Sequence, residues 1–197
     1  MGLEVSYLDF MSKHINNCFG DRSDLKMLEL GNQHISPNEI YRYRTGKNYF
    51  QSLGYNHVSI DINGHDGAEI RDLRAPDQFT NLYNKFDILT NSGTTEHVEP
   101  HHSQFDCWKI LHDCLRPTGL FLHILPDVDE LDSWGHWKGH CSLYYSDKFF
   151  QTLSLYCNYE ILESCVINGL RAVAIFKKPN SRFAINRQLL LDSISQR

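Results

Sequence analysis

Short apolar segments alternate with amphipathic segments along the chain, and this pattern is typical of a layered α/β fold. Residues 3–19 carry apolar side chains at helical spacing and are followed by Gly20, a residue that commonly ends helices. Residues 25–30 are mostly apolar and lead into Gly31, as in a buried strand. The pattern therefore predicts a helix that leads into a buried sheet.

The same patterns predict the other elements. Strands are expected at residues 58–62, 68–73, 86–90, 120–125, 159–167 and 170–176, and helices at 37–53, 100–115 and 147–156. Asn168-Gly169 joins the last two strands, and this dipeptide favours a tight hairpin turn. A hairpin at the end of a sheet that is otherwise connected by crossovers implies an antiparallel strand at or near one edge.

We expect one domain over residues 1–197, with an N-terminal helical part to residue 24, a core over 25–178 and a tail over 179–197. Residues 127–142 are polar, aromatic and irregular, which predicts a long loop. The tail is weakly helical over 181–195, and the pattern leaves open whether it packs on the core or hangs free.

Composition narrows the class of protein. The 197 residues include 19 Lys and Arg against 24 Asp and Glu, a formal net charge of −5 that argues against a general nucleic-acid binder. No apolar run reaches the roughly 18–20 residues of a membrane span, and the opening residues lack the pattern of a secretory signal. The six cysteines include no CxxC pair and are expected to be reduced, so we expect a cytoplasmic protein.

Polar residues follow the predicted strands, at the positions where ligands bind in open α/β sheets. Asp61 ends the second strand of the expected sheet, and a carboxylate there is well placed to accept hydrogen bonds from both hydroxyls of a ribose. Gly31 follows the first strand and lets the backbone approach a ligand where a Cβ would clash. These two residues predict a nucleoside-binding edge.

Several motifs in order carry a resemblance to a known family. They are Glu29-Leu30-Gly31, Asp61, Asp72-Leu73, Glu96-His97-Val98 and the terminal hairpin. Over residues 25–178 the chain resembles class I S-adenosylmethionine-dependent methyltransferases. The resemblance implies a Rossmann-like three-layer sandwich, with a seven-stranded, mostly parallel sheet and a C-terminal antiparallel hairpin.

The resemblance also implies where S-adenosylmethionine would bind. Glu29 would lie near the amino end of the cofactor and Gly31 beside its approach, while Asp61 would hold the ribose. Ile62, Asp72 and Leu73 would face the adenine, and Asn91 and Ser92 would pass beneath the methionine part. The family usually has two or three glycines in its first loop, whereas here Gly31 is followed by Asn32, Gln33 and His34. This degenerate loop must hold the methionine part with polar side chains, or it holds something else.

The segment after the fourth strand bears on the methyl acceptor. Asn91-Ser92-Gly93-Thr94 stands where an Asn-Pro-Pro-Tyr tetrad would indicate methylation of an amino group. The chain is more similar to branches that methylate oxygen or small molecules, so we expect an O-directed methyltransferase acting on a small or medium acceptor. The alternatives are a catalytically inactive methyltransferase-like binding module, which the poor glycine loop favours, and a metal-dependent hydrolase.

Histidines near this segment are candidates for acid–base chemistry. His97, His136 and His140 are the predicted catalytic residues, because a general base helps when the acceptor is a hydroxyl. Some O-methyltransferases bind a divalent metal with a Glu-x-x-Glu-His set and a later His. Glu96 and His97 match the last two positions, but Gly93 stands at the first. Zn²⁺ could take Glu96, His97 and His140, although a metal is not favoured and no metal site is predicted.

Overall fold

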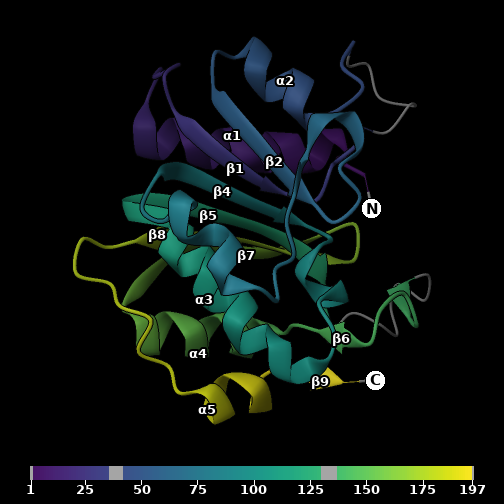
Figure 1. Ribbon diagram of the computed structural model, residues 1–197, viewed down its shortest axis with the longest axis vertical. Helices are drawn as coiled ribbons and strands as arrows, with labels where there is room; N and C mark the ends of the chain where they lie inside the picture. Colours follow the sequence, from purple (N-terminus) through teal and green to yellow (C-terminus); the bar gives the residue numbers. More distant parts are fainter. Residues whose placement is uncertain (1, 36–41, 130–136, 197) are drawn as a thin grey trace.

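The computed structural model describes residues 2–35, 42–129 and 137–196, and its main sheet has seven strands (Figure 1). The strands are β1 (Lys26–Leu30), β2 (Asn56–Asp61), β3 (Glu69–Ile70), β4 (Phe86–Ser92), β5 (Leu115–Pro126), β7 (Tyr159–Ile167) and β8 (Leu170–Lys177), in the order β3-β2-β1-β4-β5-β8-β7. The strands from β3 to β5 run parallel, and β8 is antiparallel to both β5 and β7. The predicted mostly parallel sheet and its C-terminal hairpin are confirmed.

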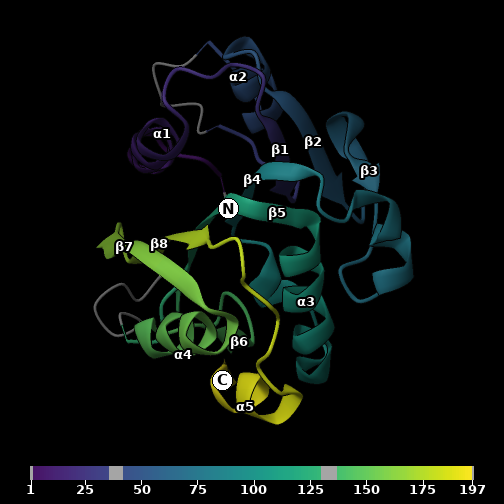
Figure 2. The ribbon, with the colours of Figure 1, turned by 90° about the vertical axis from the view of Figure 1, so that its left-hand side faces the viewer.

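Helices cover both faces of this sheet. They are α1 (Val5–Phe19), α2 (Gly46–Ser52), α3 (Gln104–Cys114), α4 (Asp147–Cys157) and α5 (Arg187–Asp192), with short 3-10 turns η1 (His65–Gly67), η2 (Pro76–Leu82), η3 (Thr95–His97) and η4 (His101–Ser103). Figure 2 shows α1 on one side of the sheet and α3 and α4 on the other. The three-layer sandwich is therefore confirmed.

The strand sequences are nearly continuous apolar runs, because a separate hydrophobic core covers each face of the sheet. Successive strand side chains point to opposite faces, so Met27 packs in the cluster around α1 while Leu28 packs in the cluster around α3 and α4. The next strand repeats the alternation, with Ile88 on the α1 side and Leu89 on the other. Burial on both faces fixes the register of the central strands.

Two predicted elements differ from the structure. The helix expected at 37–53 is wrong in its start, because residues 42–45 are not helical and α2 begins at Gly46. The Thr45 side chain accepts a hydrogen bond from the backbone N–H of Asn48 and caps the helix there. The expected start near Pro37 lies outside the described residues. The third strand is only two residues long, because the chain leaves the sheet after Ile70.

The C-terminal tail packs on the domain. Strand β9 (Ser195–Gln196) pairs antiparallel with β6 (Leu143–Tyr144), and Leu190 and Ile194 are buried in the core. An isolated bridge joins Asp127 to Tyr145 at the base of the predicted long loop. The tail therefore packs against β6, in the segment that follows that loop.

In the described ranges, no helix combines the length and apolar character needed to cross a lipid bilayer. All six cysteines are free thiols, and three of them, Cys107, Cys114 and Cys157, are buried. The cytoplasmic location expected from the sequence stays a prediction.

Candidate functional site

A cavity of about 420 Å³ opens where β1 and β2 end. This is the side of the sheet where the strand order reverses between β1 and β4, the position at which open α/β sheets bind ligands. Its lining includes six of the residues predicted to bind the cofactor, namely Gly31, Asn32, Asp61, Ile62, Asp72 and Leu73. The candidate catalytic residue His97 lines it as well. The fold thus brings residues from separate strand ends to one cavity.

Asp61 is held in place by two backbone groups. Its Oδ2 accepts a hydrogen bond from the N–H of Asn32 and its Oδ1 accepts one from the N–H of Asn63, each at 3.0 Å. A carboxylate has about four lone-pair sites, so both oxygens retain capacity for a ligand's hydroxyls. Asp61 therefore joins the loop after β1 to the loop after β2 and still faces the cavity.

Gly31 occupies a position where only glycine fits well. Its φ is +76°, and a Cβ there would lie 2.7 Å from both Gln33 Nε2 and Thr94 Oγ1. The Gln33 side chain is nearly buried and donates from Nε2 to the carbonyl of Leu30 at 3.3 Å and to Thr94 Oγ1 at 3.4 Å. Gln33, which follows Gly31 in the degenerate loop, thus folds its side chain against that loop.

The far wall of the cavity combines apolar and charged groups. Ile62 is 74% exposed, and Leu73 is nearly buried beside it in the lining. Asp72 accepts hydrogen bonds from the guanidinium of Arg74, with the closest N–O distance 2.6 Å, and this contact lowers the pKa of Asp72. Sequence reasoning missed Arg74 and Arg71 in this wall, although their position next to Asp72 could have indicated them.

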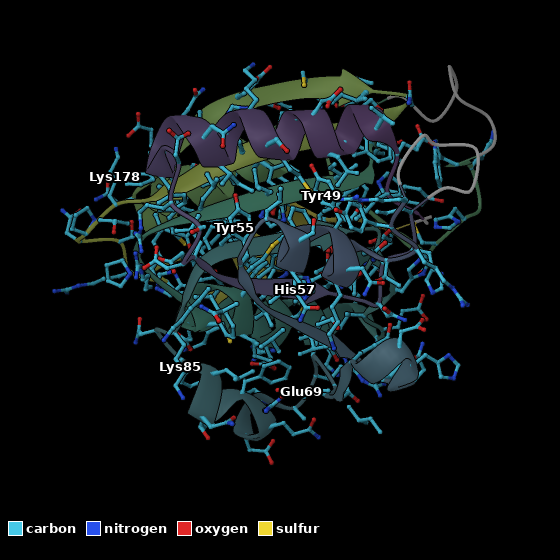
Figure 3. All side chains as sticks on the ribbon, turned by 90° about the horizontal axis from the view of Figure 1, so that it is seen from above. Tyr49, Tyr55, His57, Glu69, Lys85 and Lys178 are labelled. Carbon is cyan, nitrogen blue, oxygen red and sulfur yellow. The ribbon has the colours of Figure 1, made fainter. Side chains whose placement is uncertain are left out.

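Glu29 lies buried beneath α2 and does not line the cavity. A Cβ on Gly46 would come within 2.2 Å of Glu29 Oε1, and His57 Nε2 lies 3.5 Å from Glu29 Oε2. Figure 3 shows His57 on β2, close to α2. Burial raises the pKa of Glu29 well above its usual range and lowers the pKa of His57 to about 4.

Asn91 and Ser92 are also buried and absent from the cavity lining. The Asn91 amide donates to Thr95 Oγ1 at 2.9 Å, and its Oδ1 accepts a hydrogen bond from the Thr95 N–H at 3.3 Å. Asn91 therefore fixes the 3-10 turn η3 on the end of β4. This turn carries Glu96 and His97.

Glu96, His97 and His140 form a cluster beside the cavity. One ligand atom of each lies within 4.8 Å of the others, and the His97 and His140 rings meet edge to face at 5.0 Å. Glu96 is completely buried, and neither of its oxygens has a hydrogen-bond partner among the described residues. Burial raises the pKa of Glu96 to about 8 and lowers the pKa values of His97 and His140. His136, the third predicted catalytic residue, lies outside the described residues.

No protein-family model matches the chain, and no curated protein matches it in sequence. Several solved structures have a similar fold. The chain has the class I methyltransferase fold.

The 1,6-didemethyltoxoflavin-N1-methyltransferase of Burkholderia thailandensis, solved with S-adenosylhomocysteine, has a TM-score of 0.57 and 14% identity, covering 88% of this chain and 79% of that one. The N-methyltransferase NodS of Bradyrhizobium japonicum, also with S-adenosylhomocysteine, has a TM-score of 0.56 and 12% identity, with coverages of 89% and 86%. An O-methyltransferase family protein of Burkholderia thailandensis has a TM-score of 0.57 and 8% identity, with coverages of 87% and 56%. At such identities the likeness concerns the fold.

Proposed function

We propose that this protein is an S-adenosylmethionine-dependent methyltransferase that methylates an oxygen of a small or medium acceptor. The observation that carries the proposal is the shared cavity, in which Gly31 and Asp61 meet although they follow different strands. Two proteins of similar fold were solved with S-adenosylhomocysteine, the product that remains after methyl transfer. The cavity lies at the same switch point of the sheet where such folds bind nucleotides.

The lining residues have the chemistry that this cofactor needs. Asp61, held by two backbone N–H groups, accepts hydrogen bonds from the ribose hydroxyls. Ile62 and Leu73 offer an apolar wall to the adenine, and Asp72 lies at its edge, oriented by Arg74. Asn91 supports this site from behind, because it anchors the turn η3 through Thr95. Glu29 and Ser92 are buried behind the strand ends and do not line the cavity.

The reaction is an in-line displacement. The acceptor oxygen attacks the methyl carbon, the bond from that carbon to sulfur breaks, and the acceptor's proton leaves to a base or to water. Such a transfer depends mainly on placement, and a base helps when the acceptor is a hydroxyl. His97 lines the cavity, and the His140 ring packs edge to face on the His97 ring, so we place the acceptor's hydroxyl beside these two imidazoles. The predicted role of His136 in the same chemistry stays part of the proposal.

The segment after β4 supports the proposed preference for oxygen. Asn91-Ser92-Gly93-Thr94 replaces the Asn-Pro-Pro-Tyr tetrad of enzymes that methylate amino groups of adenine or glutamine. Asn91 is tied to Thr95 inside the protein, so its amide is not offered to an acceptor amine. The groups that face the acceptor are imidazoles, which suit a hydroxyl.

Calorimetric titration with S-adenosylmethionine tests the proposal. Wild-type protein is expected to bind one equivalent, and Asp61→Ala should weaken binding at least about 100-fold, because two hydrogen bonds to a charged group are lost. Asp21→Ala is the control, since Asp21 is exposed and outside the cavity lining. No heat and no shift in melting temperature at millimolar cofactor would overturn the proposal.

One observation favours the alternative of an inactive binding module. The Gln33 side chain packs against Gly31 and Thr94, in a loop that glycines usually keep open. If wild-type protein fails to bind the cofactor while Gln33→Gly binds it, the loop has closed and the chain serves as a binding module. Tight binding by the wild type, followed by methyl transfer to a hydroxyl compound, excludes that alternative.

A further inference from the structure

We propose that Glu96, His97 and His140 bind one zinc ion at the acceptor side of the cavity. The binding itself is inferred from the three side chains, and the role of the ion rests on the proposed methyl transfer. One ligand atom from each residue lies within 4.8 Å of the other two. Among the residues that the structure describes, this is the one group of three or more potential ligands placed so closely.

The spacing suits a single small cation. Zinc binds imidazole nitrogen and carboxylate oxygen at about 2.0–2.2 Å, so two ligand atoms of one tetrahedral ion lie about 3.4 Å apart. Glu96 Oε1 and His97 Nε2 are separated by 3.9 Å. Small side-chain rotations therefore bring the three ligand atoms to bonding distance.

Buried polar atoms of this cluster lack hydrogen-bond partners among the described residues. Both oxygens of the fully buried Glu96 and the Nε2 atom of His140 are enclosed without a hydrogen-bond partner among the described residues. A buried polar group without a partner is costly, and native proteins satisfy nearly all of them. A cation bound between these atoms would supply the absent interaction to both residues at once.

The ligands are held by the fold before any ion binds. Glu96 and His97 lie in η3, which Asn91 anchors through Thr95. His140 ends a turn in which its N–H donates to the carbonyl of Trp137 at 3.1 Å. The hydroxyl of the buried Tyr144 in β6 also donates to that carbonyl, at 3.1 Å, and β9 pairs with β6. The tail of the chain thus positions the third ligand.

The donor set favours zinc over magnesium. Two imidazoles and one carboxylate occur at catalytic zinc sites, where the fourth position is left for water or substrate. Magnesium prefers oxygen ligands in octahedral geometry, and a single carboxylate is a poor match. The nearby Cys141 is already occupied, because its thiol donates to the carbonyl of Leu143 at 3.0 Å.

The position of the ion defines its role. Because His97 lines the cavity, the fourth zinc position adjoins the space for the methyl acceptor. An acceptor hydroxyl bound there would lose its proton to water more readily, since zinc lowers the pKa of a bound oxygen. The oxyanion would then attack the methyl carbon while the bond from that carbon to sulfur breaks, and S-adenosylhomocysteine would leave without any redox step. The acceptor is therefore a compound whose hydroxyl can bind zinc.

Zinc binding is tested on full-length, untagged protein stripped with a chelator. Competition with a chromogenic zinc indicator should give one zinc ion per chain, and Co²⁺ should give the visible absorption of a four-coordinate site. Glu96→Gln and His140→Ala should each weaken zinc binding at least about tenfold and abolish the cobalt spectrum. His102→Ala is the matched control, because His102 is exposed and outside the cluster, and it should bind zinc as the wild type does.

Absence of a stoichiometric ion, or equal zinc affinity in wild type and both ligand variants, would overturn the proposal and leave the imidazoles as direct bases. Melting temperatures show that the variants are folded, and Glu96→Gln keeps the shape of the buried side chain. Titration of the same samples with S-adenosylmethionine separates the two proposals. Zinc binding without cofactor binding would refute the methyltransferase alone, and cofactor binding without zinc would refute the zinc site alone.

Discussion

Two sides of the same cavity differ in how their carboxyl groups are paired. On the side of β2 and β3, Asp61 accepts two backbone N–H groups and Asp72 is paired with Arg74. On the side that follows β4, Glu96 is fully buried and has no hydrogen-bond partner among the described residues. The buried Nε2 of the neighbouring His140 also lacks a hydrogen-bond partner within residues 2–35, 42–129 and 137–196.

This difference separates carboxyl groups that the protein itself pairs from one that has no partner among the residues that the structure describes. A paired carboxylate at a cavity is pre-oriented and can take a neutral ligand such as a sugar diol without a large electrostatic change. An unpaired buried carboxyl is costly until a cation or donor reaches it. The first side is therefore the one that we propose for the cofactor, and the second is the one that we propose for the zinc ion and the acceptor.

The largest expected effect is the pH dependence of the free energy of unfolding that arises from the unpaired carboxyl of Glu96. Burial raises the pKa of Glu96 from 4.5 to about 8, so between these values the folded, metal-free chain holds a proton that the unfolded chain releases. Stability from this group is fully present below pH 4.5 and is lost as pH rises toward 8, by about 1.4 kcal/mol per pH unit. Urea unfolding with a chelator present measures the slope, and Glu96→Gln should flatten it. An unchanged slope in that variant would contradict the unpaired state of Glu96.

The next effect concerns a buried carboxylate that does have a partner. Asp127, at the base of the loop after β5, is fully buried and forms an ion pair with Arg171. Arg171→Ala should lower the free energy of unfolding by about 3 kcal/mol, because it leaves Asp127 without its cation. Arg22→Ala is the control, since the exposed Arg22–Asp24 pair should contribute less than about 1 kcal/mol. Equal losses of unfolding free energy in the two variants would show that the buried ion pair contributes no more to stability than the exposed one.

A smaller effect tests how tightly the backbone at Gly31 is packed against its neighbours. Gly31 and Gly139 have φ values of +76° and +77°, but a Cβ on Gly31 would meet two atoms at 2.7 Å while one on Gly139 meets nothing within 4 Å. Gly139→Ala should cost about 1 kcal/mol through backbone strain alone, and Gly31→Ala about 1 kcal/mol more through crowding. Thermal melts of both variants measure the difference. The same cost at both positions would mean that Gln33 and Thr94 move aside.

The smallest effect on stability is expected at the exposed ion pair between Arg74 and Asp72. Arg74→Gln should change the free energy of unfolding by less than about 1 kcal/mol, because the Arg74 side chain is 52% exposed and its pair with Asp72 is screened by water. The pKa of Asp72 should rise toward its usual value, since Arg74 is the main cause of its lowering. NMR titration of Asp72 checks this shift. A large loss of stability would show that the edge is more rigidly coupled to the core than its exposure indicates.

Much of the architecture could be predicted from local patterns. Apolar runs such as residues 25–30 mark strands that are buried on both faces, and Asn168-Gly169 marks the hairpin that ends the sheet. The start of α2 was mispredicted, because the apolar spacing extends past the point where the cap at Thr45 begins the helix. The third strand was predicted too long, since the residues after Ile70 turn away to line the cavity.

The amino-acid pattern was sufficient for the alternation of elements and for the residues at the strand ends, because both follow from burial and chain direction over short distances. The partnerships at the cavity needed the folded chain. Whether Asp61 meets the N–H of Asn32, whether Gln33 reaches Thr94, and whether His140 reaches Glu96 all depend on loops from distant parts of the sequence. Local sequence patterns do not determine how far apart such loops lie in the folded protein. The distance between His140 and Glu96 depends on the packing of η3 against β6.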